Sequence, residues 1–243
     1  MFTAFVRPEF NRVREISAVH ERLYMNVIPF RPRPEQEPLA FAIGARVDLR
    51  VGALAAGVVR PRGEPQEAFA FSNLARLLRG ARMAWRERGI HAPLTLALPS
   101  DVQSDLEADA LSEAAIEAGC TRRALSFELC ERRMVADGPA LAEELRARGW
   151  SVVLRADPEC PLPFGARART LYAELVLNAP ESADPFLALE DGDRSPLGRR
   201  LLAAKGAGLV ITADSVRSAS QARTLAIAGF DRGGGPFAEA GLR

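Results

Sequence analysis

Charged and polar side chains stand at the ends of the short apolar runs that we interpret as β-strands. One such pair, Asp214 and Arg217, follows directly after the run at 209–212. An arginine guanidinium can bind phosphate oxygens through two parallel hydrogen bonds, and a carboxylate accepts hydrogen bonds from N–H groups such as those of a purine edge. These residue types therefore favour a ligand that carries phosphates. The residues at the strand ends are Arg46, Ser100, Asp101, Glu131, Arg132, Arg133, Arg155, Asp157, Asn178, Asp214 and Arg217.

Arginine supplies nearly all of the positive charge. Lys205 is the only lysine among 32 basic residues, which stand against 31 acidic residues and give a formal net charge of +1. A GC-rich coding sequence explains this usage without any function, and a phosphate-rich ligand explains it as well. The small net charge argues against general binding of nucleic acid.

A strand, a turn and a helix are expected to position the pair after residue 212. The apolar, β-branched run at 209–212 predicts a buried strand. The helix that follows begins near Ser218 or Ser220, either of which can cap it, and ends at Gly229. Such a unit is one βα repeat of a parallel sheet.

The same alternation of strand and helix continues along the chain. Residues 50–67 are rich in glycine, proline and arginine and indicate a loop. Because no repeat and no linker interrupts the alternation, we predict one α/β domain, a (β/α) TIM-like barrel at 23–243, preceded by an N-terminal arm or helix at 1–22. We predict helices at 71–88, 103–118 and 139–148, and strands at 24–30, 39–49, 94–98, 124–129, 150–154 and 172–178.

Length and composition agree with a single barrel. The chain has 243 residues, of which 48% are hydrophobic, and such barrels typically need about 250 residues. No apolar run reaches the roughly 18 residues of a membrane span, and the N-terminus lacks a signal-peptide core. The cysteines at 120, 130 and 160 have no metal-binding spacing. We therefore expect a cytoplasmic protein without a membrane segment, a metal or another cofactor.

The stretch 207–237 resembles a signature of EAL domains, which are barrels that bind and hydrolyse cyclic di-GMP. The signature reads AEGVET..Q...L...GCD..QG..F, and its spacing is kept as far as Gly235. The resemblance implies the EAL barrel fold and a cyclic di-GMP site at the C-terminal rim, where the carboxyl ends of the strands meet. Val216, Gln221, Leu225, Gly229, Asp231 and Gly235 match directly, Phe237 lies one residue before the final Phe, and Asp214 and Arg217 stand at the two glutamates.

Other segments resemble EAL motifs whose functional residues are partly replaced. We align the family hairpin YQPIVD…GFEALVR so that its final FEALVR falls on 41–46. The resemblance places Ala42 at Glu and Arg46 at Arg of FEALVR, Ala97 at Asn of VNLS, Glu128 and Glu131 at the glutamates of LEITES, and Arg155 at Asp of DDFG. It places Leu177 at Lys of KID and Asn178 near its Asp.

These replacements affect the metal site that the resemblance implies. Hydrolysis of a phosphodiester by bound cations needs several oxygen ligands. Arg155 would place a cation where the family has a carboxylate, so we expect no metal, no catalytic residues and no enzymatic activity. An alternative remains that Glu128 and Arg155 form only a structural ion pair.

The segment 179–196 is long for a connection without secondary structure. It leaves from the same rim and contains Asp191 and Arg194, which could contact a base and a phosphate. We expect it to be a lid over the ligand, although a surface insertion without function has the same composition.

The function we predict is a non-catalytic receptor for cyclic di-GMP that acts on an unidentified downstream protein. The resemblance to small stand-alone EAL-like barrels implies that ppGpp would compete for the same rim, because both molecules present guanine and phosphates. Two alternatives are a protein-interaction module without nucleotide binding and an enzyme that uses Glu128 and Asp214 as acid and base. The predicted ligand-binding residues are Arg46, Glu128, Glu131, Arg132, Arg133, Arg155, Asp157, Asn178, Asp191, Arg194, Asp214 and Arg217.

Overall fold

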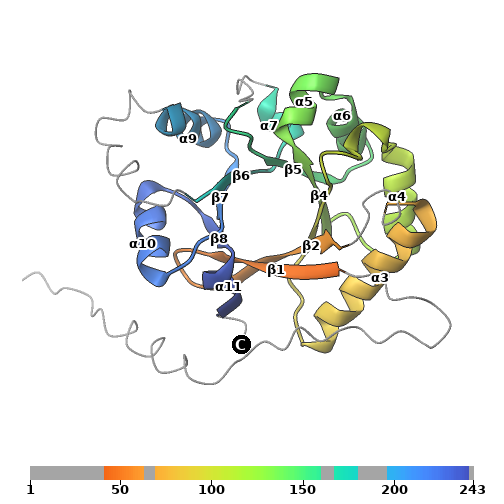
Figure 1. Ribbon diagram of the computed structural model, residues 1–243, viewed down its shortest axis with the longest axis horizontal. Coiled ribbons are helices and arrows are strands. Elements are labelled where there is room, and N and C mark those ends of the chain that lie inside the picture. The colour runs from red at the N-terminus through yellow and green to blue at the C-terminus, as the bar shows by residue number, and fades with distance from the viewer. Residues whose placement is uncertain (1–40, 63–68, 160–166, 180–195, 241–243) are drawn as a thin grey trace, which may run out of the picture.

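The strands β1 to β8 follow one another around a closed barrel in the computed structural model (Figure 1). The structure describes residues 41–62, 69–159, 167–179 and 196–240. The predicted arm at 1–22, the predicted strand at 24–30 and residues 180–195 of the predicted lid lie outside these ranges. The strands are β1 Phe41–Asp48, β2 Leu54–Pro61, β3 Leu94–Ala97, β4 Leu125–Cys130, β5 Ser151–Arg155, β6 Glu174–Asn178, β7 Val210–Asp214 and β8 Arg232–Gly234.

Helices surround the barrel on its outside (Figure 1). None of those within the described ranges has the length and apolar character needed to cross a lipid bilayer. Their bounds are α3 Phe71–Glu87, the 3-10 helix η3 Gln103–Asp105, α4 Ala108–Glu117, α5 Glu131–Asp137, α6 Ala140–Ala147, α7 Ala168–Leu171, α9 Pro196–Gly206, α10 Ala219–Ala228 and α11 Pro236–Ala240.

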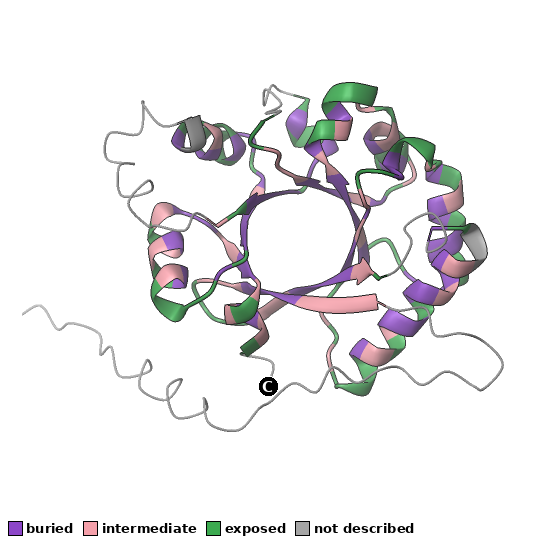
Figure 2. Ribbon diagram, viewed as in Figure 1, coloured by how far each residue is buried: buried purple, intermediate pink, exposed green. Residues whose placement is uncertain are grey.

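The apolar core lies between the strands and this ring of helices. Outward-facing Phe127 of β4 meets Trp150 edge-on, with ring centroids 5.6 Å apart, and both are buried. On α3 the predicted apolar face is buried, including Leu74, Leu78 and Trp85. The strands appear as a buried ring in Figure 2. This division leaves the inside of the barrel available for polar side chains.

The predicted barrel is confirmed, but its first strand runs in an unexpected direction. β1 pairs antiparallel with β2 on one side and with β8 on the other, whereas the remaining neighbours pair parallel. Residues 49–53 link β1 to β2, and so short a link allows a hairpin but not a crossover helix. The Asp48 carboxylate accepts hydrogen bonds from the backbone N–H groups of Arg50 and Val51 in this turn.

One strand stands where the sequence indicated a loop, and another was not predicted. The segment 50–67 contains β2, and the glycine run at 233–235 contributes to β8. The glycines of β8 are needed for close packing, because a Cβ on Gly233 would lie 2.7 Å from Leu49 Cδ2 and one on Gly234 would lie 2.9 Å from Asp214 Oδ1. A run of glycines often suggests a flexible segment, but in β8 the glycines are required because neighbouring side chains pack closely against the strand.

The predicted helices are present, with changes at their ends. The expected helix at 103–118 divides into η3 and α4, and α5, α7, α9 and α11 are additional. The helix after β7 begins as predicted: Ser218 Oγ accepts a hydrogen bond from Gln221 N at 3.1 Å, and Gly229 ends the helix in the left-handed conformation with φ 95°.

Candidate functional site

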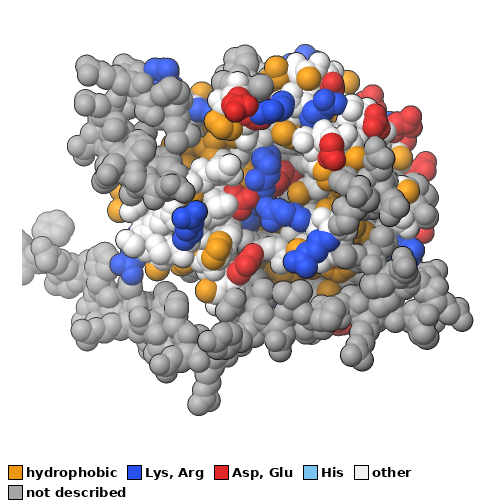
Figure 3. Space-filling view, in the orientation of Figure 1, with side chains coloured by type: hydrophobic (Ala, Val, Ile, Leu, Met, Phe, Trp, Pro, Cys, Tyr) orange, Lys and Arg blue, Asp and Glu red, His pale blue; other side chains and the backbone are white. Residues whose placement is uncertain are grey.

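Charged side chains from seven strands meet inside the barrel, and we call this set the charged network. It contains four arginines and three carboxylates, so its formal charge is +1 (four minus three). Figure 3 shows side chains of both signs gathered at the mouth of the barrel that faces the viewer. The charged network consists of Arg46 of β1, Arg60 of β2, Glu128 of β4, Arg155 of β5, Glu174 of β6, Asp214 of β7 and Arg232 of β8.

Arg46 occupies the middle of the charged network. Its guanidinium donates to Glu128 Oε2 through Nη2, and to Glu174 Oε1 through Nη1 at 3.1 Å. Glu174 also accepts from Thr212 Oγ1 at 2.6 Å and from Arg232 Nη1 at 2.7 Å. Arg46 is 0% exposed, so these contacts are closed off from solvent.

Arg60, Arg155 and Asp214 form the part of the charged network that reaches the C-terminal rim. Arg155 donates from Nε to Glu128 Oε1 at 2.6 Å and from Nη2 to Asp214 Oδ2 at 2.8 Å. Arg60 donates from Nη2 to the same Asp214 Oδ2 at 3.0 Å. The Arg60 and Arg155 side chains are 41% and 29% exposed, so neither arginine is sealed from solvent as Arg46 is.

Opposite charges hold these groups ionised. Burial alone would raise the pKa of Glu128, but the charges of Arg46 and Arg155 outweigh it and lower that pKa. Burial also opposes ionisation of Asp214, and Arg155 and Arg60 hold its pKa below the usual range. The pKa of Arg155 is raised despite burial, because Glu128 and Asp214 favour the charged guanidinium.

A divalent cation does not fit the carboxylates of this rim. Both oxygens of Glu128 accept hydrogen bonds from arginines, and Asp214 Oδ2 is shared between two more arginine contacts. Within the described ranges, no group of three or more His, Cys, Asp or Glu residues is arranged to hold a metal ion. The neighbouring guanidiniums would also repel the cation.

Two cavities open beside the rim part of the charged network. The first has a volume of about 310 Å³, and its lining includes Arg60, Ser100, Glu128, Cys130 and Arg155. The second has a volume of about 320 Å³ and lies where β6 and β7 meet the start of α10. Together they offer space on both sides of the strand ends that carry the arginines.

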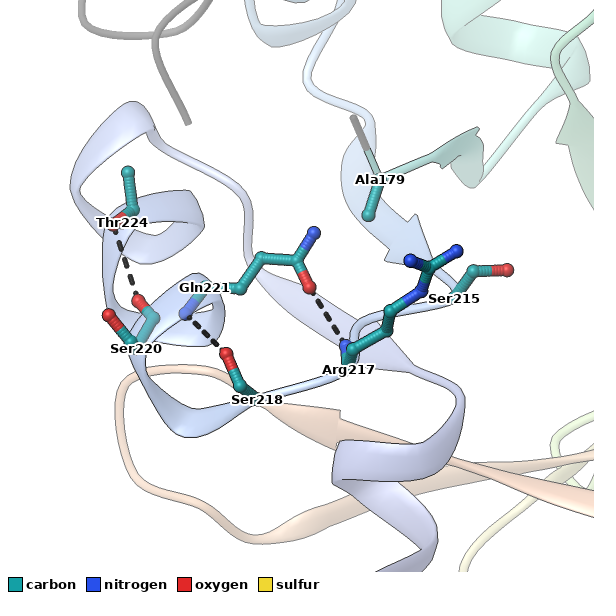
Figure 4. Close-up of a pocket in the computed structure, with 7 residues that line it drawn as sticks. All are labelled: Ala179, Ser215, Arg217, Ser218, Ser220, Gln221 and Thr224. Atoms are coloured by element: carbon teal, nitrogen blue, oxygen red, sulfur yellow. Dashed lines mark hydrogen bonds between the residues drawn. The ribbon is translucent and has the colours of Figure 1, made fainter. Parts of the chain in front are cut away.

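Polar side chains line most of the second cavity (Figure 4). The Arg217 side chain extends between Ala179 and Ser215, while its backbone N–H donates to Gln221 Oε1 at 2.8 Å. Ser218 and Thr224 also contribute hydroxyl groups to the lining. Ser215 has φ 63°, an uncommon conformation for a residue other than glycine.

The antiparallel direction of β1 corrects the expected place of Arg46. In a hairpin of the form YQPIVD…GFEALVR, the motif FEALVR lies on the second strand, which in this structure is β2. Aligned with that strand, the motif covers 55–60 and agrees with this chain at Val59 and Arg60, with Ala56 at its glutamate. Arg46 lies inside the barrel and not at the rim, because the first strand of a hairpin runs opposite to the others.

The remaining predicted residues are only partly brought together. Glu131 is buried, pairs with Arg200 and accepts from Asp157 N at 2.7 Å. Arg132 contacts Asp157 at 2.7 Å, and Arg133 pairs with Asp137 on its own helix at 3.2 Å. These contacts lie around the start of α5, next to the rim. Asn178 is exposed and stands beside Asp214 in the β6–β7 register, and Asp191 and Arg194 lie outside the described residues.

Three members of the charged network were not predicted: Arg60, Glu174 and Arg232. Glu174 is the first residue of an apolar strand, and Arg232 is the first residue of a glycine-rich one. Because charged residues are rarely buried unless they are paired, a charge at such a position could have indicated a buried ion pair. Arg60 was missed because its segment was interpreted as a loop. The ion pair of Glu128 and Arg155, which was the alternative to a role in ligand binding, is present, and it includes Asp214 and Arg46 as well.

Comparisons with known proteins identify the fold. No protein-family model matches the sequence, and no curated protein matches it. Solved structures do match. A structure described as "PaMucR Phosphodiesterase, c-di-GMP complex" has a TM-score of 0.63 at 15% identity and covers 82% of this chain and 94% of its own.

Two further matches cover most of the chain. The EAL domain of Mycobacterium smegmatis DcpA has a TM-score of 0.57 at 20% identity and covers 81% of this chain and 90% of its own. A Klebsiella pneumoniae BlrP1 calcium/cy-diGMP complex has a TM-score of 0.61 at 15% identity and covers 97% of this chain and 67% of its own. The chain therefore has the barrel fold of EAL domains.

The comparisons overturn the prediction that the chain is not an enzyme. The structures that share its fold include one described as a phosphodiesterase and another described as an EAL enzyme. That prediction relied only on residues missing from the aligned motifs.

Proposed function

We propose that the C-terminal rim binds cyclic di-GMP and that Arg60 and Arg155 contact its phosphates. The observation that carries the proposal is that both arginines converge on one carboxylate oxygen, Asp214 Oδ2, while each side chain stays partly exposed. A guanidinium has five N–H donors in a planar fork, so donors remain for a phosphate. The cyclic di-GMP complexes among the similar structures support the same ligand.

The second cavity is the proposed place for a guanine base. Its hydroxyl, amide and guanidinium groups suit the donors and acceptors of a guanine edge, with Arg217 and Gln221 as the longest side chains. Asn178 and Asp214, which end neighbouring strands, directly precede two lining residues of this cavity, Ala179 and Ser215. Asp214 also contacts both rim arginines. The proposed contacts thus extend along one ligand from phosphates to base.

We extend the proposal to ppGpp as a competing ligand. This nucleotide also combines guanine with phosphates, so the same arginines and the same polar cavity would recognise it. In a titration with cyclic di-GMP, ppGpp should raise the apparent Kd in proportion to its own concentration. Additive heats from the two nucleotides, titrated in sequence, would instead place them at separate sites.

Isothermal titration with cyclic di-GMP in EDTA tests the main proposal, since the chelator keeps the ligand intact if the protein carries a metal-dependent phosphodiesterase activity. Arg60→Ala and Arg155→Ala should each weaken binding at least tenfold, which corresponds to about 1.4 kcal/mol. The matched control is Arg79→Ala, because Arg79 is an exposed arginine of α3 that pairs with Glu117 at 3.4 Å. It should bind like the unchanged protein.

Absence of binding heat from the folded protein would overturn the proposal and favour the protein-interaction module. Equal affinities for the rim variants and the Arg79→Ala control would show that cyclic di-GMP binds elsewhere. A parallel incubation with Mg²⁺ or Mn²⁺, followed by chromatography, measures whether the bound ligand is converted to its linear product.

A further inference from the structure

The Asp214 carboxylate lies between the two arginines that are the proposed phosphate contacts. Asp214 Oδ2 accepts a hydrogen bond from Arg60 Nη2 at 3.0 Å and another from Arg155 Nη2 at 2.8 Å. A phosphate oxygen that accepted from both guanidiniums would take this same position. The chain therefore supplies from its own side chains one of the anionic oxygens that the two arginines attract.

Asp214 is also held from the side of its own strand. Its Oδ1 accepts a hydrogen bond from Ser215 N at 3.1 Å, and a Cβ on Gly234 would lie only 2.9 Å from the same oxygen. The Asp214 side chain is 12% exposed. With the strands on one side and the arginines on the other, the carboxylate has little room to turn away. A ligand phosphate therefore meets the arginines while the carboxylate is still in place.

The rim carries as many negative as positive charges. Burial opposes ionisation of Asp214, but Arg155 and Arg60 outweigh burial and lower its pKa, so its charge is present at neutral pH. A second carboxylate, Glu128, accepts from Arg155 Nε at 2.6 Å. Two guanidiniums thus face two carboxylates, and the formal charge of this group is zero (two minus two). Arg46 contacts Glu128 from the interior, where solvent does not reach it.

A rim of this kind distinguishes phosphates by their charge. The energy between two charges is proportional to their product. A phosphodiester carries one negative charge, whereas a phosphomonoester carries nearly two above its second pKa of about 6. The repulsion from Asp214 is therefore about twice as large for a monoester, and a rim without net charge offers no additional attraction to offset it.

We propose that Asp214 determines which phosphates the rim accepts, and that it selects phosphodiesters over phosphomonoesters and pyrophosphates. The inference rests on the proposed binding of cyclic di-GMP, in which both phosphates are diesters. It ranks cyclic di-GMP above the linear dinucleotide pGpG, which has a terminal phosphomonoester. It also ranks cyclic di-GMP above ppGpp, which has two diphosphate groups.

Isothermal titration of the full chain in EDTA at pH 8, with cyclic di-GMP and pGpG as the two ligands, tests the role of Asp214. Asp214→Asn keeps the shape of the side chain and removes its charge. It should tighten binding of cyclic di-GMP about threefold and binding of pGpG about tenfold, because a repulsion proportional to charge squares the factor when the charge doubles. Equal factors for the two ligands, or weaker binding of both, would overturn the proposal.

The matched control is Asp231→Asn, which makes the same change in net charge at the opposite end of the barrel. Asp231 directly precedes β8, its Oδ2 accepts from Ile211 N at 2.9 Å, and its side chain is 36% exposed. Both affinities should equal those of the unchanged chain. If Asp231→Asn changes them as much as Asp214→Asn does, the total charge of the protein is responsible and the proposal is wrong.

Inorganic pyrophosphate separates this proposal from the proposed function, since it carries no base. Its affinity should rise about tenfold in Asp214→Asn, by the same proportionality to charge. That gain, combined with no heat from cyclic di-GMP in the unchanged chain, would support the role of Asp214 and contradict the proposed function. No gain in pyrophosphate affinity would contradict the role of Asp214, whichever nucleotides bind.

Asp214→Ser serves if Asp214→Asn does not fold. Serine is smaller, so it relieves the close approach to Gly234, and it removes the same charge. It should change the ratio of the cyclic di-GMP and pGpG affinities in the same direction as Asp214→Asn. A folded Asp214→Ser variant with the ratio of the unchanged chain would contradict the proposal.

Discussion

At the scale of single residues, Arg46 is the least ordinary side chain of the molecule. An arginine is rarely fully buried unless its charge is paired, and here two carboxylates, Glu128 and Glu174, pair with it. Its Nε has no hydrogen-bond partner, so the guanidinium is well but not completely satisfied. The residue supports the rim indirectly, through Glu128, which also contacts Arg155.

Replacing Arg46 should therefore reduce the free energy of unfolding more than replacing an exposed arginine does. In Arg46→Met, two buried carboxylates lose one partner each, and breaking a buried ion pair in this way typically costs about 3–5 kcal/mol. Denaturant unfolding should show a loss near the lower end of that range, since Arg155 and Arg232 remain as partners.

The control for this prediction is Arg79→Met, which removes the exposed pair with Glu117 and should cost less than about 1 kcal/mol. A third variant, Arg46→Lys, keeps the charge and should lose less stability than Arg46→Met. If Arg46→Met unfolds at the same denaturant concentration as the unchanged chain, the charged network does not stabilise the fold.

At the scale of elements, the β1–β2 hairpin decides which arginine reaches the rim. Because β1 runs antiparallel, Arg60 near the end of β2 joins the carboxyl ends of the parallel strands. β2 is held against α3 and β3 at Gly57, where a Cβ would lie 2.8 Å from Trp85 Cζ2 and 2.9 Å from Leu94 Cδ2. The missing side chain is thus a packing requirement.

Gly57→Ala should destabilise the barrel by about 1–3 kcal/mol, the usual cost of overpacking a core. The matched change Gly206→Ala at the end of α9 meets no atom within 4 Å and should be neutral or slightly stabilising. Thermal unfolding of both variants measures the difference. Equal midpoints would show that Trp85 and Leu94 shift aside without cost.

At the scale of the whole molecule, the charged network crosses the barrel from the C-terminal rim to its opposite end. Asp214 and Arg155 end their strands at the rim, whereas Arg232 opens β8 and Glu174 opens β6 at the other end. Glu128 and Arg46 connect the two. Stability of the barrel therefore depends on the ionisation of carboxylates that solvent hardly reaches.

This dependence predicts sensitivity to acid. The pKa values of Glu128 and Asp214 are lowered in the folded state by their arginine partners. A carboxyl with a lowered folded pKa contributes its full stability above the ordinary pKa near 4 and loses it as the pH falls towards the lowered value. Unfolding free energies measured from pH 7 downward should thus decline below about pH 4.

The Arg46→Met variant provides the internal control for the acid prediction. Without the charge of Arg46, the pKa of Glu128 should lie closer to its ordinary value, so less stability remains to be lost in acid. The decline below pH 4 should be shallower in this variant. Parallel declines in both proteins would mean that other carboxyl groups cause the acid sensitivity.

Much of this architecture can be predicted from the sequence because it depends on local physics. The period of apolar residues determined α3, the capping hydroxyl of Ser218 and the glycine at 229 determined α10, and short β-branched runs determined most of the parallel strands. The strand ends that carry Arg155 and Asp214 were predicted for the same reason, and the two residues do meet.

Only the tertiary structure decided the direction of β1 and the composition of the charged network. The direction of a strand depends on the length of its connection to the next strand and on which edge of the sheet is still open when the barrel closes. The residues of the strand itself determine neither. The placement of Arg46 inside the barrel and of Arg60 at its rim follows from that direction. The pairing of Glu174 with Arg46 and Arg232 joins three strands far apart in the chain, so only closure of the barrel could bring these charges together.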